Sequence, residues 1–126
     1  MAPFFSSTET TLDNWNVLTK SNDLEDVREA SKKRPQLLYK HSHTCSICVM
    51  AKESIENRMD EIRKKADLNF VNVIEARPVS NAIEETFEVR HESPQILLIT
   101  DGASVWNTSH FSIKAEAILK ALKEEA

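Results

Sequence analysis

The stretch that decides the fold is Gln36-Leu-Leu-Tyr-Lys-His-Ser-His-Thr-Cys-Ser-Ile-Cys48, which holds both cysteines of the chain. Residues 36–40 are mostly apolar and predict a strand. The residues after Cys45 have the periodicity of an amphipathic helix. A Cys-x-x-Cys pair at such a strand-to-helix junction is typical of dithiol redox sites. The stretch therefore predicts redox chemistry at the start of a helix.

The chain has 126 residues, a length that favours one domain with one core. We predict a loose leader over residues 1–13 and a single domain over residues 14–126. The composition, 40% hydrophobic and 29% charged, is that of an ordinary folded protein. A net charge of −4 without a basic stripe argues against nucleic acid as a partner.

Membrane insertion and export are not predicted. No apolar run approaches the ~20 residues that a membrane-spanning helix requires. The N-terminus lacks the basic and apolar segments of a signal peptide. These features predict a cytoplasmic protein, and in that compartment two cysteines are more often reactive or metal-binding than a structural disulfide.

Hydrophobic periodicity and turn residues predict an alternating series of strands and helices. The elements are an edge strand near Trp15–Leu18, helix 22–31, strand 36–40, helix 45–65, strand 68–74, a helix beginning at Pro78, strand 95–100, strand 104–108 and helix 112–123. Asp101-Gly102 is a hairpin signal between the last two strands. This order predicts a thioredoxin-like α/β fold, in which helices flank a central mixed sheet of four to five strands.

The two cysteines have different predicted roles. Cys45 is the candidate nucleophile, because the N–H groups and dipole of a helix N-terminus favour a thiolate. Cys48 lies one turn into the helix on the same face, so it is the candidate resolving thiol and should be more protected. His43 lies in the turn and is a candidate to lower the pKa of Cys45. For His41, the same role and a simple place at the strand end stay equally open.

A second predicted element of the site is Pro94, at the start of the buried strand 95–100. We predict that the Ser93–Pro94 peptide bond is cis and that Ser93 and Pro94 face the cysteines and bind an extended substrate. An ordinary trans proline opening a strand is the alternative. Thr44 and Ser46, which flank Cys45, are predicted to contribute backbone N–H groups to the same site.

Four motifs together resemble the YtxJ-type bacilliredoxin family, also called bacilliredoxin C. They are His41-Ser-x-Thr-Cys45-x-Ile, Arg77 with Val79-Ser80, Val89-x-His91-Glu-Ser-Pro94-Gln95, and Ser109-His110-x-x-Ile113. The resemblance runs from about Trp15 to Leu122. It implies a thioredoxin-like fold and a thiol-disulfide oxidoreductase that removes bacillithiol, a low-molecular-weight thiol, from mixed disulfides on client proteins. It implies no cofactor apart from the small thiol as co-substrate, and a reductant that the sequence does not identify.

The chain departs from the pattern of that family at two positions. Ser46 stands where the family usually has proline, and Cys48 stands where it commonly has serine. A second thiol could expel bacillithiol from Cys45 and leave a Cys45–Cys48 disulfide. We therefore predict dithiol exchange in this member. Another small thiol, such as coenzyme A, stays open as the co-substrate.

Three alternatives remain at this stage. The first is a general thioredoxin-like disulfide reductase, although Tyr39 occupies the position where thioredoxins place a buried aspartate. The second is a metal-binding module that uses His41, His43, Cys45 and Cys48 for zinc or copper, although their spacing is not a usual zinc-finger pattern. The third is a scaffold whose cysteines only pack in the core.

Overall fold

The central strand of the protein is β2 (Gln36–His41), and every one of its residues is buried. Buried on both faces, it pairs in parallel with β3 (Asp67–Asn72) and in antiparallel with β4 (Gln95–Thr100). Tyr39 thus lies between Phe70 of β3 and Ile96 of β4. Such continuous apolar runs are expected where helices cover both faces of a sheet.

The computed structural model describes residues 12–126. Its sheet is completed by β1 (Asn16–Val17), parallel to β3, and by β5 (Ala103–Ser109), antiparallel to β4, in the order β1-β3-β2-β4-β5. The helices are α1 (Ser21–Ala30), α2 (Ser46–Asn57), α3 (Met59–Arg63), α4 (Arg77–Phe87) and α5 (Ala115–Glu125), with a short 3-10 helix at His110–Ser112. The predicted mixed sheet flanked by helices is confirmed, with five strands. The predicted leader over residues 1–13 lies almost wholly outside the described residues.

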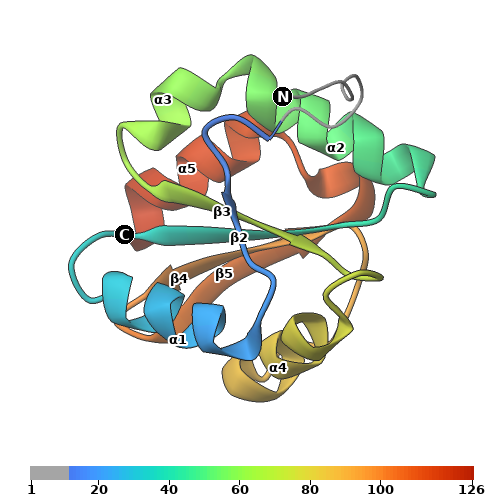
Figure 1. Cartoon of the computed structure of the whole chain (residues 1–126). Coiled ribbons are helices and arrows are strands. Elements are labelled where there is room, and N and C mark those ends of the chain that lie inside the picture. Colours follow the sequence, from blue (N-terminus) through green and yellow to red (C-terminus); the bar gives the residue numbers. More distant parts are fainter. Residues whose placement is uncertain (1–11) are drawn as a thin grey trace.

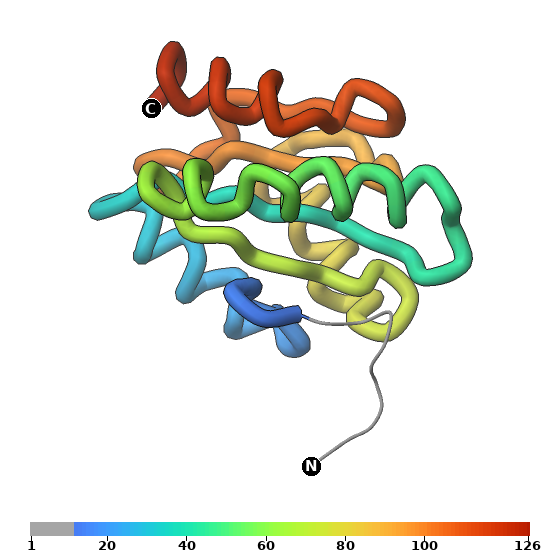
Figure 2. Tube along the Cα trace, turned by 90° about the horizontal axis from the view of Figure 1, so that it is seen from above, coloured from blue at the N-terminus to red at the C-terminus, as the bar shows by residue number. Residues whose placement is uncertain are grey.

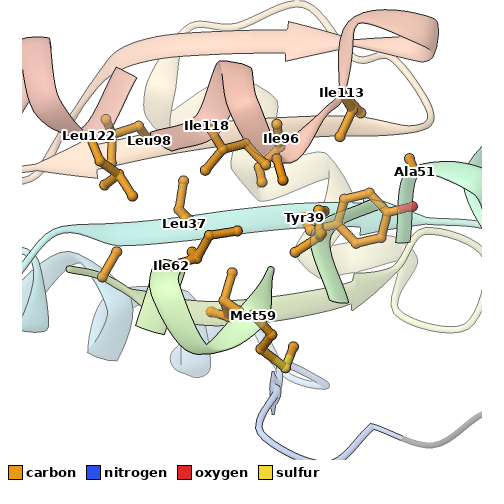
Figure 3. Close-up of a cluster of buried hydrophobic side chains, with 14 of the residues drawn as sticks. Leu37, Tyr39, Ala51, Met59, Ile62, Ile96, Leu98, Ile113, Ile118 and Leu122 are labelled. Carbon is orange, nitrogen blue, oxygen red and sulfur yellow. The ribbon is translucent and has the colours of Figure 1, made fainter. Parts of the chain in front are cut away.

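The helices form two layers, with α2, α3 and α5 on one face of the sheet and α1 and α4 on the other (Figures 1 and 2). Each layer has its own core. Leu37 and Tyr39 pack with α2, α3 and α5 (Figure 3), whereas Leu38 packs with α1 and α4. This division follows from the alternation of side chains along a strand. By the same alternation, Lys40 points to the face covered by α1 and α4.

Two predicted helices have different bounds in the structure. The helix predicted over 45–65 is interrupted at Arg58, whose φ of −126° and ψ of 28° are not helical. The Arg58 guanidinium bonds Glu61 within the next turn, and Met59 and Ile62 remain buried after the break. The helix predicted from residue 112 begins at Ala115, after the 3-10 turn.

The hairpin predicted at Asp101-Gly102 is confirmed between β4 and β5. Both residues have positive φ, 53° and 80°, as a type I′ turn requires. Gly102 is the only glycine in the chain, and it occupies a position where a side chain would be strained.

The topology brings several chain segments to one end of the sheet. Because β2 and β3 are parallel and β4 runs the opposite way, the turn after β2, the turn after β3 and the loop before β4 meet there. The same end carries the N-termini of α2 and α4 (Figure 1). Both cysteines and the Ser93–Pro94 bond lie in these segments.

Candidate functional site

Cys45 occupies the N-cap of α2. The turn that leads to it is closed by the Cys45 N–H, which donates to the carbonyl oxygen of Ser42 at 3.3 Å. With an extended backbone, Cys45 directs its Sγ back over the first turn of the helix, where it accepts a hydrogen bond from the Cys48 N–H at 3.2 Å. This is the geometry of a side-chain N-cap, with sulfur in the place of the usual oxygen. A backbone N–H aimed at sulfur stabilises negative charge there.

The two thiols differ in exposure, as predicted. Cys45 is partly exposed and Cys48 is fully buried, and the two are not joined by a disulfide. Burial, together with the hydrogen bond to Cys45, raises the pKa of Cys48 to about 11. The Cys48 Sγ lies 3.7 Å from the Ser93 Oγ, so the second thiol contacts the loop before β4. The site therefore has one accessible sulfur, that of Cys45, and one buried sulfur, that of Cys48.

The Ser93–Pro94 peptide bond is cis, as predicted. The carbonyl oxygen of Pro94 accepts a hydrogen bond from the His110 N–H at 3.0 Å. The His110 side chain returns to the same loop, with its Nε2 2.9 Å from the Glu92 Oε1. The motifs around Pro94 and His110, far apart in sequence, are thus one structural unit. Ser93 is half-buried beside Cys48, on the side of the site opposite α2.

Tyr39 and His41 form a buried pair beneath the cysteine turn. The Tyr39 hydroxyl is 2.7 Å from the Cys48 carbonyl oxygen and 3.1 Å from the His41 Nδ1. A hydroxyl has one proton, and a carbonyl can only accept, so Tyr39 donates to Cys48. His41 must then donate from Nδ1 to the Tyr39 oxygen, which fixes its tautomer. Burial lowers the pKa of His41 to about 4, and burial also raises the pKa of Tyr39.

A second buried pair lies below the loop before β4. The Lys40 side chain is fully buried, and its Nζ donates to the Gln95 Oε1 at 3.0 Å. The Gln95 amide in turn donates to the Arg90 carbonyl oxygen at 3.0 Å. Burial lowers the pKa of Lys40 to about 8. Sequence reasoning missed this pair, although a lysine inside an apolar strand was a signal that could have found it.

The remaining predicted site residues lie on the exposed side of the turn. His43, Thr44 and Ser46 are exposed, and the His43 ring packs edge-on against His41 at 5.2 Å between centroids. The Thr44 Oγ1 lies 3.0 Å from the Ser42 Oγ. The N–H that reaches the Cys45 sulfur belongs to Cys48 rather than to Thr44 or Ser46. Effects of His43 on Cys45 and of Thr44 and Ser46 on substrate stay predictions.

The part of the chain that the structure describes contains no group of side chains that would support the metal-binding alternative. Over residues 12–126, no three His, Cys, Asp or Glu side chains are grouped so that they could hold a metal ion. His41 is buried and directs its Nδ1 to Tyr39, so it is engaged away from the cysteines. The four candidate ligands are close in sequence without converging in space.

Comparison with known proteins identifies the family. The sequence profile of the family "Monothiol bacilliredoxin BrxC" matches residues 16–118. The chain belongs to the monothiol bacilliredoxin family. The Cys45–Cys48 pair is therefore a dithiol in a family named for one thiol, and the suspected resemblance is confirmed.

Solved structures agree on the fold of this bacilliredoxin. A thioredoxin-fold protein assigned as a candidate oxidoreductase has 29% identity and a TM-score of 0.77, over 88% of this chain and 95% of that one. Thioredoxin from Fasciola hepatica has 19% identity and a TM-score of 0.71, over 88% and 99%. Thioredoxin from Malassezia sympodialis has 14% identity and a TM-score of 0.70, over 87% and 89%. The thioredoxin-like fold is thereby confirmed.

Within residues 12–126, no helix combines the length and the apolar character needed to cross a bilayer.

Proposed function

We propose that this bacilliredoxin is a thiol-disulfide oxidoreductase that removes bacillithiol, or a similar small thiol, from mixed disulfides on client proteins. In this proposal Cys45 is the nucleophile and Cys48 the resolving thiol. The observation that carries it is the asymmetry of the pair: the Cys45 sulfur is accessible and accepts the Cys48 N–H, whereas the Cys48 sulfur is buried directly behind it. The reaction takes place in the cytoplasm, where clients and reductant are available.

The first step exchanges one disulfide for another. The Cys45 thiolate attacks the bacillithiol sulfur of the mixed disulfide, and the bond between that sulfur and the client sulfur breaks. The client leaves as a thiolate, which takes a proton from water, and bacillithiol is now bound to Cys45. The client backbone lies along Ser93 and Pro94, because the Ser93 hydroxyl, 3.7 Å from the Cys48 sulfur, places this segment beside the cysteines. Thr44 and Ser46 border the same opening.

The second step uses the buried thiol. Cys48 attacks the Cys45 sulfur, the bond between Cys45 and the bacillithiol sulfur breaks, and a Cys45–Cys48 disulfide forms, while the Cys48 proton passes through water to the departing bacillithiol thiolate. The positions support this step, since the Cys48 N–H already touches the Cys45 sulfur. The raised pKa of Cys48 keeps its thiol protonated in the protein with both thiols free. An external thiol or dithiol reductant then supplies two electrons and restores both thiols.

The second candidate is a general disulfide reductase of the thioredoxin kind. The overall fold favours it, since thioredoxins match over most of the chain. The buried site argues against it, because Tyr39, at the position where thioredoxins place a buried aspartate, is instead a hydrogen-bond donor to the helix backbone. The family membership also favours the specialised reaction.

The test is the intact mass of a Cys48→Ser variant after incubation with a bacillithiolated protein. We expect one bacillithiol adduct on Cys45 and release of the client in its reduced form. Cys45→Ser, the matched control, should acquire no adduct, and the wild type should end with an internal disulfide and free bacillithiol. If Cys48→Ser gains no adduct while the wild type still reduces an unrelated disulfide, general exchange replaces the proposed function.

A further inference from the structure

A small cavity lies at the same end of the sheet as the cysteine site, against the start of α4. It has a volume of about 160 Å³ and is lined by Val73, Arg77, Ser80, Asn81 and His91. Since one water occupies about 30 Å³ in the liquid, the cavity has room for a group the size of a few waters. Its walls are polar apart from Val73. A cavity of this size and polarity fits one small charged group.

The donors in this cavity are not used within the protein. Ser80 is only 3% exposed, and within residues 12–126 no hydrogen bond engages its hydroxyl. Over the same residues, the Arg77 guanidinium has neither an ion pair nor a hydrogen bond. The N-terminus of α4, where Arg77 lies, has no side-chain cap. A guanidinium without a protein partner and a buried hydroxyl are groups that bind an oxyanion.

The acidic side chains nearby are already engaged. Glu84 accepts the His91 N–H at 3.2 Å, and Glu92 is paired with His110. Burial lowers the pKa of His91, and the positive charges of Lys40 and Arg77 lower it further, whereas Glu84 and Glu92 raise it. Arg77 therefore contributes a positive charge to the lining of the cavity, while the carboxylates of Glu84 and Glu92 accept hydrogen bonds from other groups.

Two segments connect the cavity to the cysteines. His91 is two residues from Ser93, whose hydroxyl is 3.7 Å from the Cys48 sulfur. Val73, on the other wall, donates its N–H to the His41 carbonyl oxygen at 2.9 Å, at the start of the cysteine turn. Two residues of extended chain span about 7 Å. The loop before β4 and the turn after β3 therefore border both the cavity and the cysteine site.

We propose that the cavity formed by Arg77, Ser80, Asn81 and His91 binds the anionic group of the small thiol that is transferred at Cys45. This inference rests on the proposed function and adds to it a recognition site for the thiol. The shared chemistry is an oxyanion at the far end of the molecule. Bacillithiol carries it as the carboxylates of malate, and coenzyme A carries it as phosphates.

The direct test is binding of isolated anions, followed by NMR of the backbone amides. L-Malate should shift the signals of Arg77, Ser80, Asn81 and His91, and the neutral dimethyl ester of malate should not. An Arg77→Gln variant should bind malate about tenfold more weakly, the loss expected when one charged hydrogen-bonding partner is removed. Ser80→Ala is a second variant that changes a single buried hydroxyl. Arg90→Gln, in the same loop but outside the cavity, should bind as the wild type does.

Inorganic phosphate is the second arm of the experiment. Tighter binding of phosphate than of malate at the same amides would support the oxyanion site and identify a phosphate-bearing thiol as its ligand. No shift with either anion would overturn the inference, whatever the exchange assay shows. Malate binding in a protein that fails to remove bacillithiol would leave the anion site standing and refute the proposed function instead.

The same variants test whether the site acts in the reaction. The wild type should remove bacillithiol from a client peptide faster than it removes the neutral thiol 2-mercaptoethanol from the same peptide. Arg77→Gln should lower this ratio about tenfold, and Arg90→Gln should leave it within twofold. An unchanged ratio in Arg77→Gln would overturn the assignment of the cavity to the transferred thiol.

Discussion

The hydroxyl oxygen of Tyr39 lies 2.7 Å from the carbonyl oxygen of Cys48, which ties strand β2 directly to the first turn of α2. The contact holds the turn that bears both cysteines against the centre of the sheet. It is made at the position where thioredoxins place a buried aspartate, so this protein uses a neutral donor where they use an acid. The consequence is a site that is fixed in place without a buried negative charge.

Replacement of Tyr39 by phenylalanine should destabilise the protein. The change removes the additional donor to the Cys48 carbonyl, which lies within α2, and leaves the His41 Nδ1–H without an acceptor inside the core. Buried groups left unsatisfied cost about 1–3 kcal/mol. Urea unfolding should show this loss as a lower midpoint with an unchanged slope. An unaltered midpoint would mean that the hydroxyl has no structural role.

His41 should be a neutral Nδ1–H tautomer across the physiological pH range. The tautomer follows from hydrogen-bond counting at Tyr39, and burial holds the pKa of His41 at about 4. Two-dimensional ¹H–¹⁵N NMR of the imidazole should show a protonated Nδ1 and an unprotonated Nε2 from pH 7.5 down to pH 5.5. An Nε2–H pattern would contradict the hydrogen-bond assignment. A titration near pH 6.5 would contradict the burial effect.

The sheet was predictable because its strands are continuous apolar runs with local turn signals. Strand 95–100 has the predicted bounds, and strand 36–40 extends by one residue to His41. The break at Arg58 was not predictable, because neither proline nor glycine marks it and the apolar spacing continues through it. The last helix begins at Ala115 instead of the predicted residue 112. The 3-10 turn that precedes it depends on the contact between His110 and Pro94, which local sequence does not reveal.

For the site, the cysteine pair was identifiable because it is a local pattern, and its presence favoured a cis over a trans bond at Pro94. The polar contacts behind them depend on tertiary register. Tyr39 reaches Cys48, nine residues away, and Lys40 reaches Gln95 across 55 residues. Such pairs appear only when the order and register of β2 and β4 are known. The motifs that contain Arg77 and His91 could be recognised in the sequence. The sequence did not predict that these two residues line the same cavity.

The reactivity of the two cysteines should differ strongly. In a Cys45→Ser variant the remaining thiol is buried, and burial keeps the pKa of Cys48 above its ordinary value, so little thiolate exists at neutral pH. In a Cys48→Ser variant the remaining thiol is partly exposed at the helix N-cap. We expect iodoacetamide at pH 7.5 to modify the first variant at least about tenfold more slowly, as followed by intact mass. Equal rates would refute the division into nucleophile and resolving thiol.

The charge of buried Lys40 should lower stability at and below neutral pH. Its folded pKa is about 8, below the ordinary value of 10.5, so between these values the unfolded chain holds a proton that the folded chain lacks. The free energy of unfolding must therefore increase as the pH is raised from 8 toward 10.5. The same stabilisation is lost when the pH is lowered to 8. The useful range is pH 8–9, because above pH 9 the raised pKa of Cys48 acts in the opposite direction.

Lys40→Met removes this titration while keeping a long side chain in the same space. Over pH 8–9 the wild type should gain about 1 kcal/mol relative to Lys40→Met, since one proton difference is worth at most about 1.4 kcal/mol per pH unit. Urea unfolding at both pH values measures the gain. Lys32→Met, which changes an exposed lysine, should follow the wild type. If Lys40→Met follows the wild type as well, then Lys40 is charged in the folded protein throughout this range, and its hydrogen bond to Gln95 is that of an ammonium group.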